Sequence, residues 1–61
     1  MPEVIVYALE GRTPLQKKSL MRAITNAVAL HFAVDAAGVV VQIVESKDDS
    51  KSKGGIPYSE R

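Results

Sequence analysis

The stretch TPLQKKSLMRAITNAVALHF, residues 13–32, has the pattern of one helix, and its place between two apolar runs sets the topology of the chain. Thr13 suits the N-cap, Pro14 suits the first helical position, and Gln16 completes a capping box with Thr13. Helical periodicity predicts one buried face and one solvated face. The apolar residues expected on the buried face are Leu20, Ile24, Ala27, Val28 and Phe32.

Two β-rich runs flank this helix. Residues 4–9, VIVYAL, end at Glu10-Gly11-Arg12, where glycine permits a turn, and residues 39–44, VVVQIV, are β-branched almost throughout. A helical crossover of this length favours a parallel pair of strands with a right-handed connection. The sequence therefore predicts an α+β fold built on a βαβ unit.

The tail, residues 45–61, changes character along its length. It is polar and charged as far as Lys53, and Gly54-Gly55-Ile56-Pro57-Tyr58 then has the composition of a turn and a short strand. Because Gly54-Gly55 suits a tight reversal, we expect a loop followed by a short C-terminal hairpin that reaches onto a neighbouring subunit. No internal repeat or linker is visible, so residues 1–61 are predicted to form a single domain.

Self-association is expected from the small size of the chain. A chain of 61 residues buries too little apolar surface to offset its conformational entropy comfortably. Cysteine is absent and there is one histidine, so neither disulfides nor an ordinary structural zinc site can supply the missing stability, and we expect no metal and no cofactor. The strands lack clean polar and apolar alternation, and one helix covers only one face of a sheet. The other face is therefore expected to meet another subunit.

Charge and hydropathy exclude several classes of partner. A net charge of +1 provides no field that would suggest nucleic acid or an anionic membrane as a partner. No apolar stretch approaches the ~18 residues of a membrane span, and the N-terminus lacks the pattern of a signal peptide. We therefore expect a cytoplasmic protein whose macromolecular partners are copies of itself.

The proline in second position is the first candidate catalytic residue. Initiator methionine is usually trimmed before a small residue, and trimming would leave Pro2 as a secondary amine. An α-amino group titrates near pH ~8, so Pro2 could act as a general base close to neutral pH. Many unrelated proteins begin Met-Pro, and a proline that only initiates the strand is the alternative. If Met1 is retained, the Pro2 nitrogen is an amide and cannot act as a base.

Four features taken together resemble 4-oxalocrotonate tautomerase and its small relatives over nearly the whole chain: Pro2, Leu9-Glu10-Gly11-Arg12, Gln16-Lys17 and Gly54-Gly55. The resemblance implies that two subunits form a four-stranded sheet with two helices on one face, and that three such dimers form a homohexamer. It also implies a cofactor-independent tautomerase that interconverts enol and keto forms of a small carboxylate-bearing substrate. Pro2 would move the proton, and Arg12 would bind a carboxylate or carbonyl oxygen.

Two positions depart from the pattern of this family. The second arginine of the family aligns with Val40, and the aromatic residue that walls its pocket aligns with Lys51. Lys51 and Lys53 are therefore candidate substrate-binding cations that replace the lost arginine. Lysines solvated in a loop are the alternative interpretation. These departures leave the identity of the acidic substrate open.

Two other functions remain open beside the tautomerase. A hydratase or dehalogenase would need a carboxylate to activate water, for which Glu10 and Glu45 are the available candidates. A non-catalytic or partner-dependent subunit of a mixed hexamer is suggested by the missing second arginine.

Overall fold

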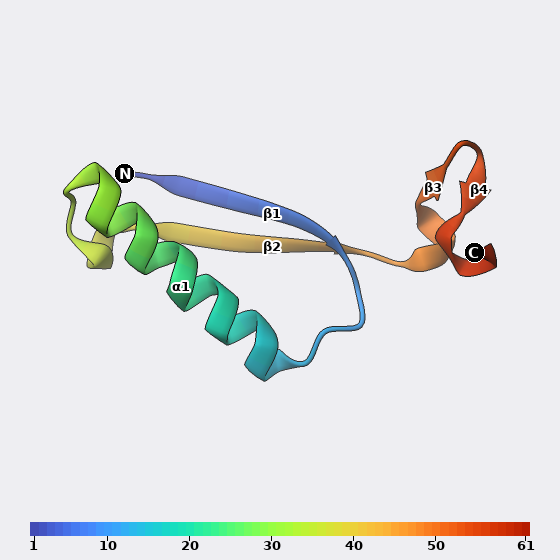
Figure 1. The fold of residues 1–61 in the computed structure, drawn as a ribbon, viewed down its shortest axis with the longest axis horizontal. Helices are drawn as coiled ribbons and strands as arrows, with labels where there is room; N and C mark the ends of the chain where they lie inside the picture. The colour runs from blue at the N-terminus through green and yellow to red at the C-terminus, as the bar shows by residue number, and fades with distance from the viewer.

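The computed structural model describes residues 1–61 as a parallel βαβ unit followed by a C-terminal arm (Figure 1). Strand β1 (Glu3–Leu9), helix α1 (Pro14–Phe32) and strand β2 (Val40–Ser46) form the unit. The arm contains the short strands β3 (Ser52–Lys53) and β4 (Ile56–Pro57), which pair in antiparallel orientation. The predicted α+β fold class, with parallel strands and a C-terminal hairpin, is confirmed.

The two long strands pair over their full length. Glu3 lies opposite Val40 and Leu9 lies opposite Ser46. Beyond β1, the Glu10 N–H donates to the Ser46 carbonyl at 2.9 Å. The sequence predicted a strand over residues 39–44. Because the hydrogen-bonded ladder continues to Ser46, β2 ends two residues later than predicted.

The start of α1 is the predicted capping box. The Gln16 N–H donates to Thr13 Oγ1 at 3.1 Å, and the Thr13 N–H donates to Gln16 Oε1 at 2.9 Å. These two bonds satisfy backbone donors that a helix start leaves without partners. The helix ends at Phe32, and the C-cap residue Ala33 adopts a left-handed conformation with φ 54°. No helix of the structure combines the length and the apolar character needed to cross a membrane.

The helix face that lies on the sheet differs in part from the predicted one. Of the expected face, Ile24 and Val28 are half-buried, but Leu20 and Phe32 are 44% and 68% exposed and Ala27 is also exposed. The half-buried helix residues are Lys17, Met21, Ile24, Thr25, Val28 and Ala29. The helix carries more apolar residues than its own two strands can cover, so the remainder face solvent in a single chain.

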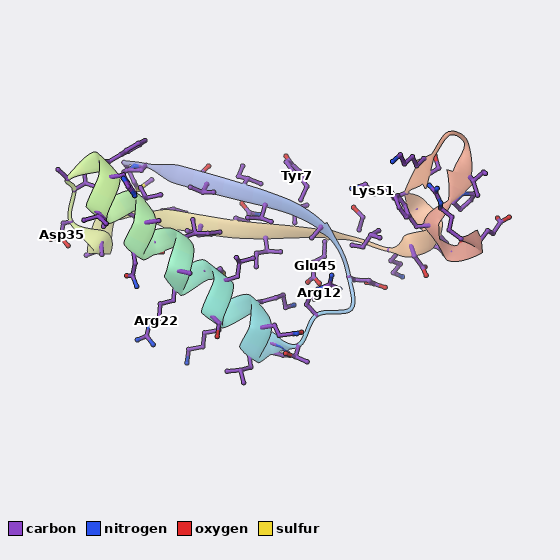
Figure 2. The ribbon with its side chains drawn as sticks, viewed as in Figure 1. Tyr7, Arg12, Arg22, Asp35, Glu45 and Lys51 are labelled. Atoms are coloured by element: carbon purple, nitrogen blue, oxygen red, sulfur yellow. The ribbon has the colours of Figure 1, made fainter.

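The single chain has no buried core. None of its 61 residues is buried, and Ile5 and Tyr7 are 43% and 71% exposed. Tyr7 lies on the sheet face opposite α1 (Figure 2), and Ile5, two positions earlier in the strand, shares that face. The radius of gyration is 14.6 Å, whereas a compact chain of this length is expected to have about 10.5 Å. Figure 1 shows the reason, since the arm extends beyond the sheet and away from the helix. The open sheet face and the arm both leave apolar surface available to further subunits.

The hairpin of the arm turns at Gly54 and Gly55. Their φ angles are 62° and 82°, which glycine adopts without the steric cost that other residues meet. Two consecutive positive φ angles match the twist of a tight antiparallel hairpin. The predicted reversal at this pair is therefore confirmed.

Candidate functional site

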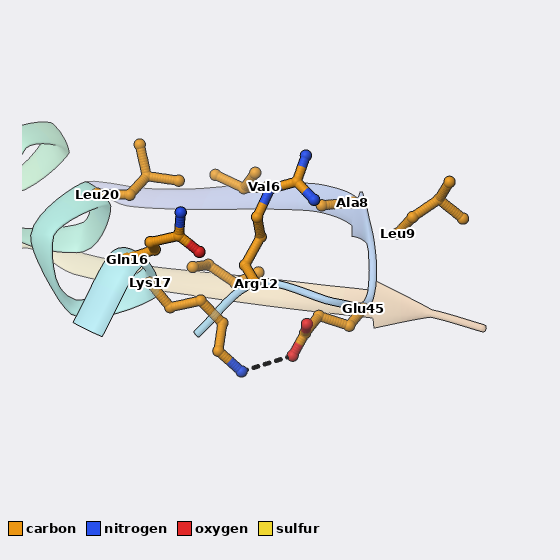
Figure 3. A pocket seen from close by; sticks show the side chains of 9 residues that line it. Val6, Ala8, Leu9, Arg12, Gln16, Lys17, Leu20 and Glu45 are labelled. Carbon is orange, nitrogen blue, oxygen red and sulfur yellow. Dashed lines mark hydrogen bonds and ion pairs between the residues drawn. The ribbon is translucent and has the colours of Figure 1, made fainter. Parts of the chain in front are cut away.

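A pocket of about 230 Å³ opens where the C-terminal ends of β1 and β2 meet the first turns of α1 (Figure 3). Its apolar wall is formed by Val6, Ala8, Leu9, Leu20 and Ile43. Its polar wall is formed by Arg12, Gln16, Lys17 and Glu45. An apolar cavity with a few polar groups is the usual form of a small-molecule site.

Arg12 reaches the pocket from the loop between β1 and α1. The loop turns at Gly11, whose φ of 125° favours glycine. The guanidinium of Arg12 has no hydrogen bond or ion pair within the chain, and Figure 3 shows its side chain along the pocket. A planar guanidinium with free N–H groups can bind a carboxylate through two parallel bonds.

Gln16 is oriented by the capping box. Its Oε1 accepts the Thr13 N–H, and this bond fixes which end of the side-chain amide faces the backbone. The other end, Nε2, makes no hydrogen bond within the chain and carries two N–H groups. The capping box that starts α1 therefore also leaves Nε2 of Gln16 as an uncharged hydrogen-bond donor in the wall of the pocket.

Lys17 and Glu45 form an ion pair across the pocket wall. Lys17 Nζ lies 2.8 Å from Glu45 Oε1, and the two side chains are 30% and 28% exposed. The pair joins the first turn of α1 to the end of β2, across 28 positions of sequence, and is drawn as the dashed line in Figure 3. It is the one ion pair of the chain. Lys17 is therefore occupied, whereas Arg12 is free.

Pro2 and Arg12 lie at opposite ends of β1. Pro2 precedes the strand, and its carbonyl accepts the Val40 N–H at 3.0 Å. Arg12 follows the other end, and the seven residues of β1 span about 23 Å at the usual rise of a strand. A single chain therefore does not bring these two predicted site residues together.

Lys51 and Lys53 lie on the arm, outside the pocket of their own chain. Lys51 precedes β3 and is labelled on the arm in Figure 2, Lys53 belongs to β3, and both are exposed. Of the four residues named from the sequence for the tautomerase, Arg12 alone lines the pocket, and of the two carboxylates named for a hydratase, Glu45 lines it. Within one chain the two lysines lie at the far end of β2 from Val40, whose backbone N–H donates to the Pro2 carbonyl.

The sequence analysis gave Gln16 and Lys17 no role in the pocket, and it named Glu45 only as a candidate carboxylate for a hydratase or dehalogenase. The capping box was the available signal for Gln16, because the side-chain bond to Thr13 determines where its free nitrogen lies. No local pattern pairs Lys17 with Glu45. The structure has no group of three or more His, Asp or Glu side chains arranged to hold a metal ion.

Comparisons with known proteins show similarity to tautomerases over nearly the whole chain. A family model described as "Tautomerase enzyme" matches residues 2–56. A probable tautomerase of Bradyrhizobium diazoefficiens is 48% identical over 61 residues, which cover 100% of this chain and 91% of the relative.

Solved structures agree as well. The structure of a 4-oxalocrotonate tautomerase homologue has a TM-score of 0.94 at 30% identity, covering 100% of this chain and 97% of that one. A heterohexamer 4-oxalocrotonate tautomerase from Chloroflexus aurantiacus has a TM-score of 0.90 at 37% identity, covering 98% of this chain and 97% of that one.

Proposed function

The chain belongs to the tautomerase family, and we propose that it is a cofactor-independent tautomerase that interconverts the enol and keto forms of a small carboxylate-bearing substrate. The observation that carries this proposal is the free guanidinium of Arg12 beside an apolar pocket. Such a pocket would bind an acidic substrate. The residues matched by the family model include Pro2, which is the candidate for moving the substrate's proton.

A two-fold dimer would complete the site. The free edge of β1 is open to a second copy, because the sheet has only two strands. In an antiparallel pair, the start of one strand lies beside the end of the other. Pairing two copies of β1 in this way would bring Pro2 of the partner subunit towards Arg12. The dimer would have a four-stranded sheet with two helices on one face, and two-fold dimers are the commonest symmetric assemblies.

Three such dimers would form a homohexamer in which the open sheet faces meet. This assembly would cover Ile5 and Tyr7, which are exposed in the single chain. It would also give the arm a neighbour to contact. The chain alone lacks a buried core, which supports an obligate assembly.

The proposed reaction uses Pro2 as base and then as acid. After removal of Met1, the uncharged ring nitrogen would accept the proton of the enol hydroxyl as the C=O bond forms. The electrons of the carbon–carbon double bond would then take the proton from Pro2 onto carbon, which restores the neutral amine. Arg12 would hold the carboxylate or stabilise negative charge on the carbonyl oxygen.

Lys51 and Lys53 are proposed as auxiliary cations. Their arm extends beyond the sheet (Figure 1) and neither lysine lines the pocket of its own chain, so they would act at the site of a neighbouring subunit. Neither lysine has an ion-pair partner within the chain. Their charges could assist in attracting an acidic substrate where the family's second arginine is replaced by Val40.

A second candidate function is that of a partner-dependent subunit in a mixed hexamer. Val40 favours it, because a different chain could bring the missing guanidinium, and one similar protein is a heterohexamer. A hydratase or dehalogenase activity has less support. Glu45 is engaged by Lys17, and Glu10 does not line the pocket, so neither carboxylate is free there to activate water.

The test combines the intact mass of the purified protein with its rate of ketonising phenylenolpyruvate. We expect a protein without Met1 that is active, and a Pro2→Ala variant that is slower by about 10²–10⁴-fold, the usual contribution of general acid–base catalysis. An equally fast variant would refute the role of Pro2. A fully trimmed but inactive protein would make the partner-dependent subunit the leading candidate.

A further inference from the structure

The pocket contains two basic side chains but offers only one to a ligand. Arg12 is free, whereas Lys17 contacts Glu45 at 2.8 Å. Both partners of this pair are about one-third exposed or less, so solvent screens their attraction only in part. Among the residues that one chain contributes, the uncompensated charge of the pocket is therefore that of a single guanidinium, with the neutral donor of Gln16 beside it.

We propose that the Lys17–Glu45 ion pair makes the pocket selective for a substrate end that carries one carboxylate. Arg12 and the amide nitrogen of Gln16 bind that carboxylate, and the pair disfavours a second carboxylate at the same end. This inference rests on the proposed function, and it narrows the substrate class to enol acids whose pocket-bound end has a single negative charge.

The pair discriminates in two ways. It withholds the ammonium of Lys17 from the ligand, because that group is held between α1 and β2. It also keeps the carboxylate of Glu45 in the pocket wall, where it would repel a second ligand carboxylate. If Lys17 moved to bind that second group, Glu45 would lose its partner and its repulsion would increase.

A pair that only ties α1 to β2 would behave differently. Its loss would change stability, and it would change the binding of all acidic ligands to a similar degree. A selectivity role predicts a change in the ratio of two affinities, which a uniform loosening of the pocket does not produce.

The test compares phenylacetate with phenylmalonate, which carry one and two carboxylates at the same end. Dissociation constants are measured by NMR titration at pH 8 on the assembled protein, for the natural chain, for Glu45→Gln and for Lys17→Met/Glu45→Gln. Glu45→Gln releases Lys17, and we expect it to shift the affinity ratio about fivefold towards phenylmalonate. The double variant lacks both the repelling carboxylate and a released ammonium, so we expect it to shift the ratio towards phenylmalonate by less than Glu45→Gln does.

A ratio that stays within about twofold in Glu45→Gln would overturn the proposal, as would an equal shift in the double variant. If Glu45→Gln does not assemble, Lys17→Gln provides the test. It leaves Glu45 unpaired and should weaken phenylmalonate binding about fivefold more than phenylacetate binding, and equal weakening would overturn the proposal. Ketonisation of phenylenolpyruvate by the natural chain is measured separately, so that failure of the tautomerase proposal is distinguished from failure of the selectivity.

Discussion

Replacing Tyr7 with alanine tests whether the sheet face opposite α1 is an interface between subunits. Tyr7 is 71% exposed on that face. A buried aromatic side chain covers roughly 200 Å², so the exposed part of Tyr7 amounts to about 140 Å², which is worth about 3.5 kcal/mol when buried. Alanine would keep a minor share of this area, and we expect a loss of about 2.5 kcal/mol for each copy of the contact. Such a loss corresponds to a roughly 65-fold weaker association.

Sedimentation velocity over a concentration series measures this effect, together with thermal unfolding at a low and a high protein concentration. Tyr7→Phe keeps most of the apolar area, and Arg22→Ala is the matched control because Arg22 lies on the helix side away from the sheet (Figure 2). We expect Tyr7→Ala to dissociate at higher concentrations than either, with a Tm that depends on concentration because folding and association are linked. The interface would be refuted if Tyr7→Ala and Arg22→Ala sedimented and unfolded identically at every concentration.

Three further substitutions test the site and the helix start. Arg12→Lys is expected to raise the KM for phenylenolpyruvate about tenfold, because an ammonium keeps the charge but loses the planar fork of the guanidinium. Steady-state kinetics measure this KM, with Arg22→Lys as the control. An unchanged KM would contradict the role of Arg12. Changing both Lys51 and Lys53 to methionine should raise the same KM with kcat within about twofold, and unchanged kinetics would indicate lysines that are only solvated. Thr13→Ala removes the acceptor of the Gln16 N–H and should lower the free energy of unfolding by about 1 kcal/mol. Urea denaturation at fixed protein concentration measures this free energy. If Thr13→Ser, which keeps a hydroxyl, lost as much stability as Thr13→Ala, the result would argue against the cap.

Features that depend on neighbouring residues could be predicted from the sequence. The capping box needs only Thr13 and Gln16, which lie three positions apart, and both of its hydrogen bonds are present. The reversal at Gly54-Gly55 needs only two residues that tolerate positive φ. The parallel pairing followed from the length of the helical crossover, because an antiparallel hairpin needs no such connection.

Contacts between distant elements could not be predicted in the same way. The Lys17–Glu45 pair depends on where α1 crosses β2, which no pattern within either segment specifies. The prediction of the helix face that packs on the sheet was only partly correct, for a related reason. Leu20 and Phe32 have the periodicity of core residues, but Leu20 lines the pocket and Phe32 is exposed. Periodicity alone does not distinguish packing on the sheet from a pocket wall or an open surface.

The placement of Pro2 and Arg12 at opposite ends of one strand has a genetic consequence. If each working pocket takes one of these residues from each of two chains, a chain without Pro2 and a chain without Arg12 would still pair to give one pocket with both residues and one with neither. Defects in two copies of the gene would then partly mask each other. After duplication, the two copies could lose different halves of the chemistry and survive together, each dependent on the other.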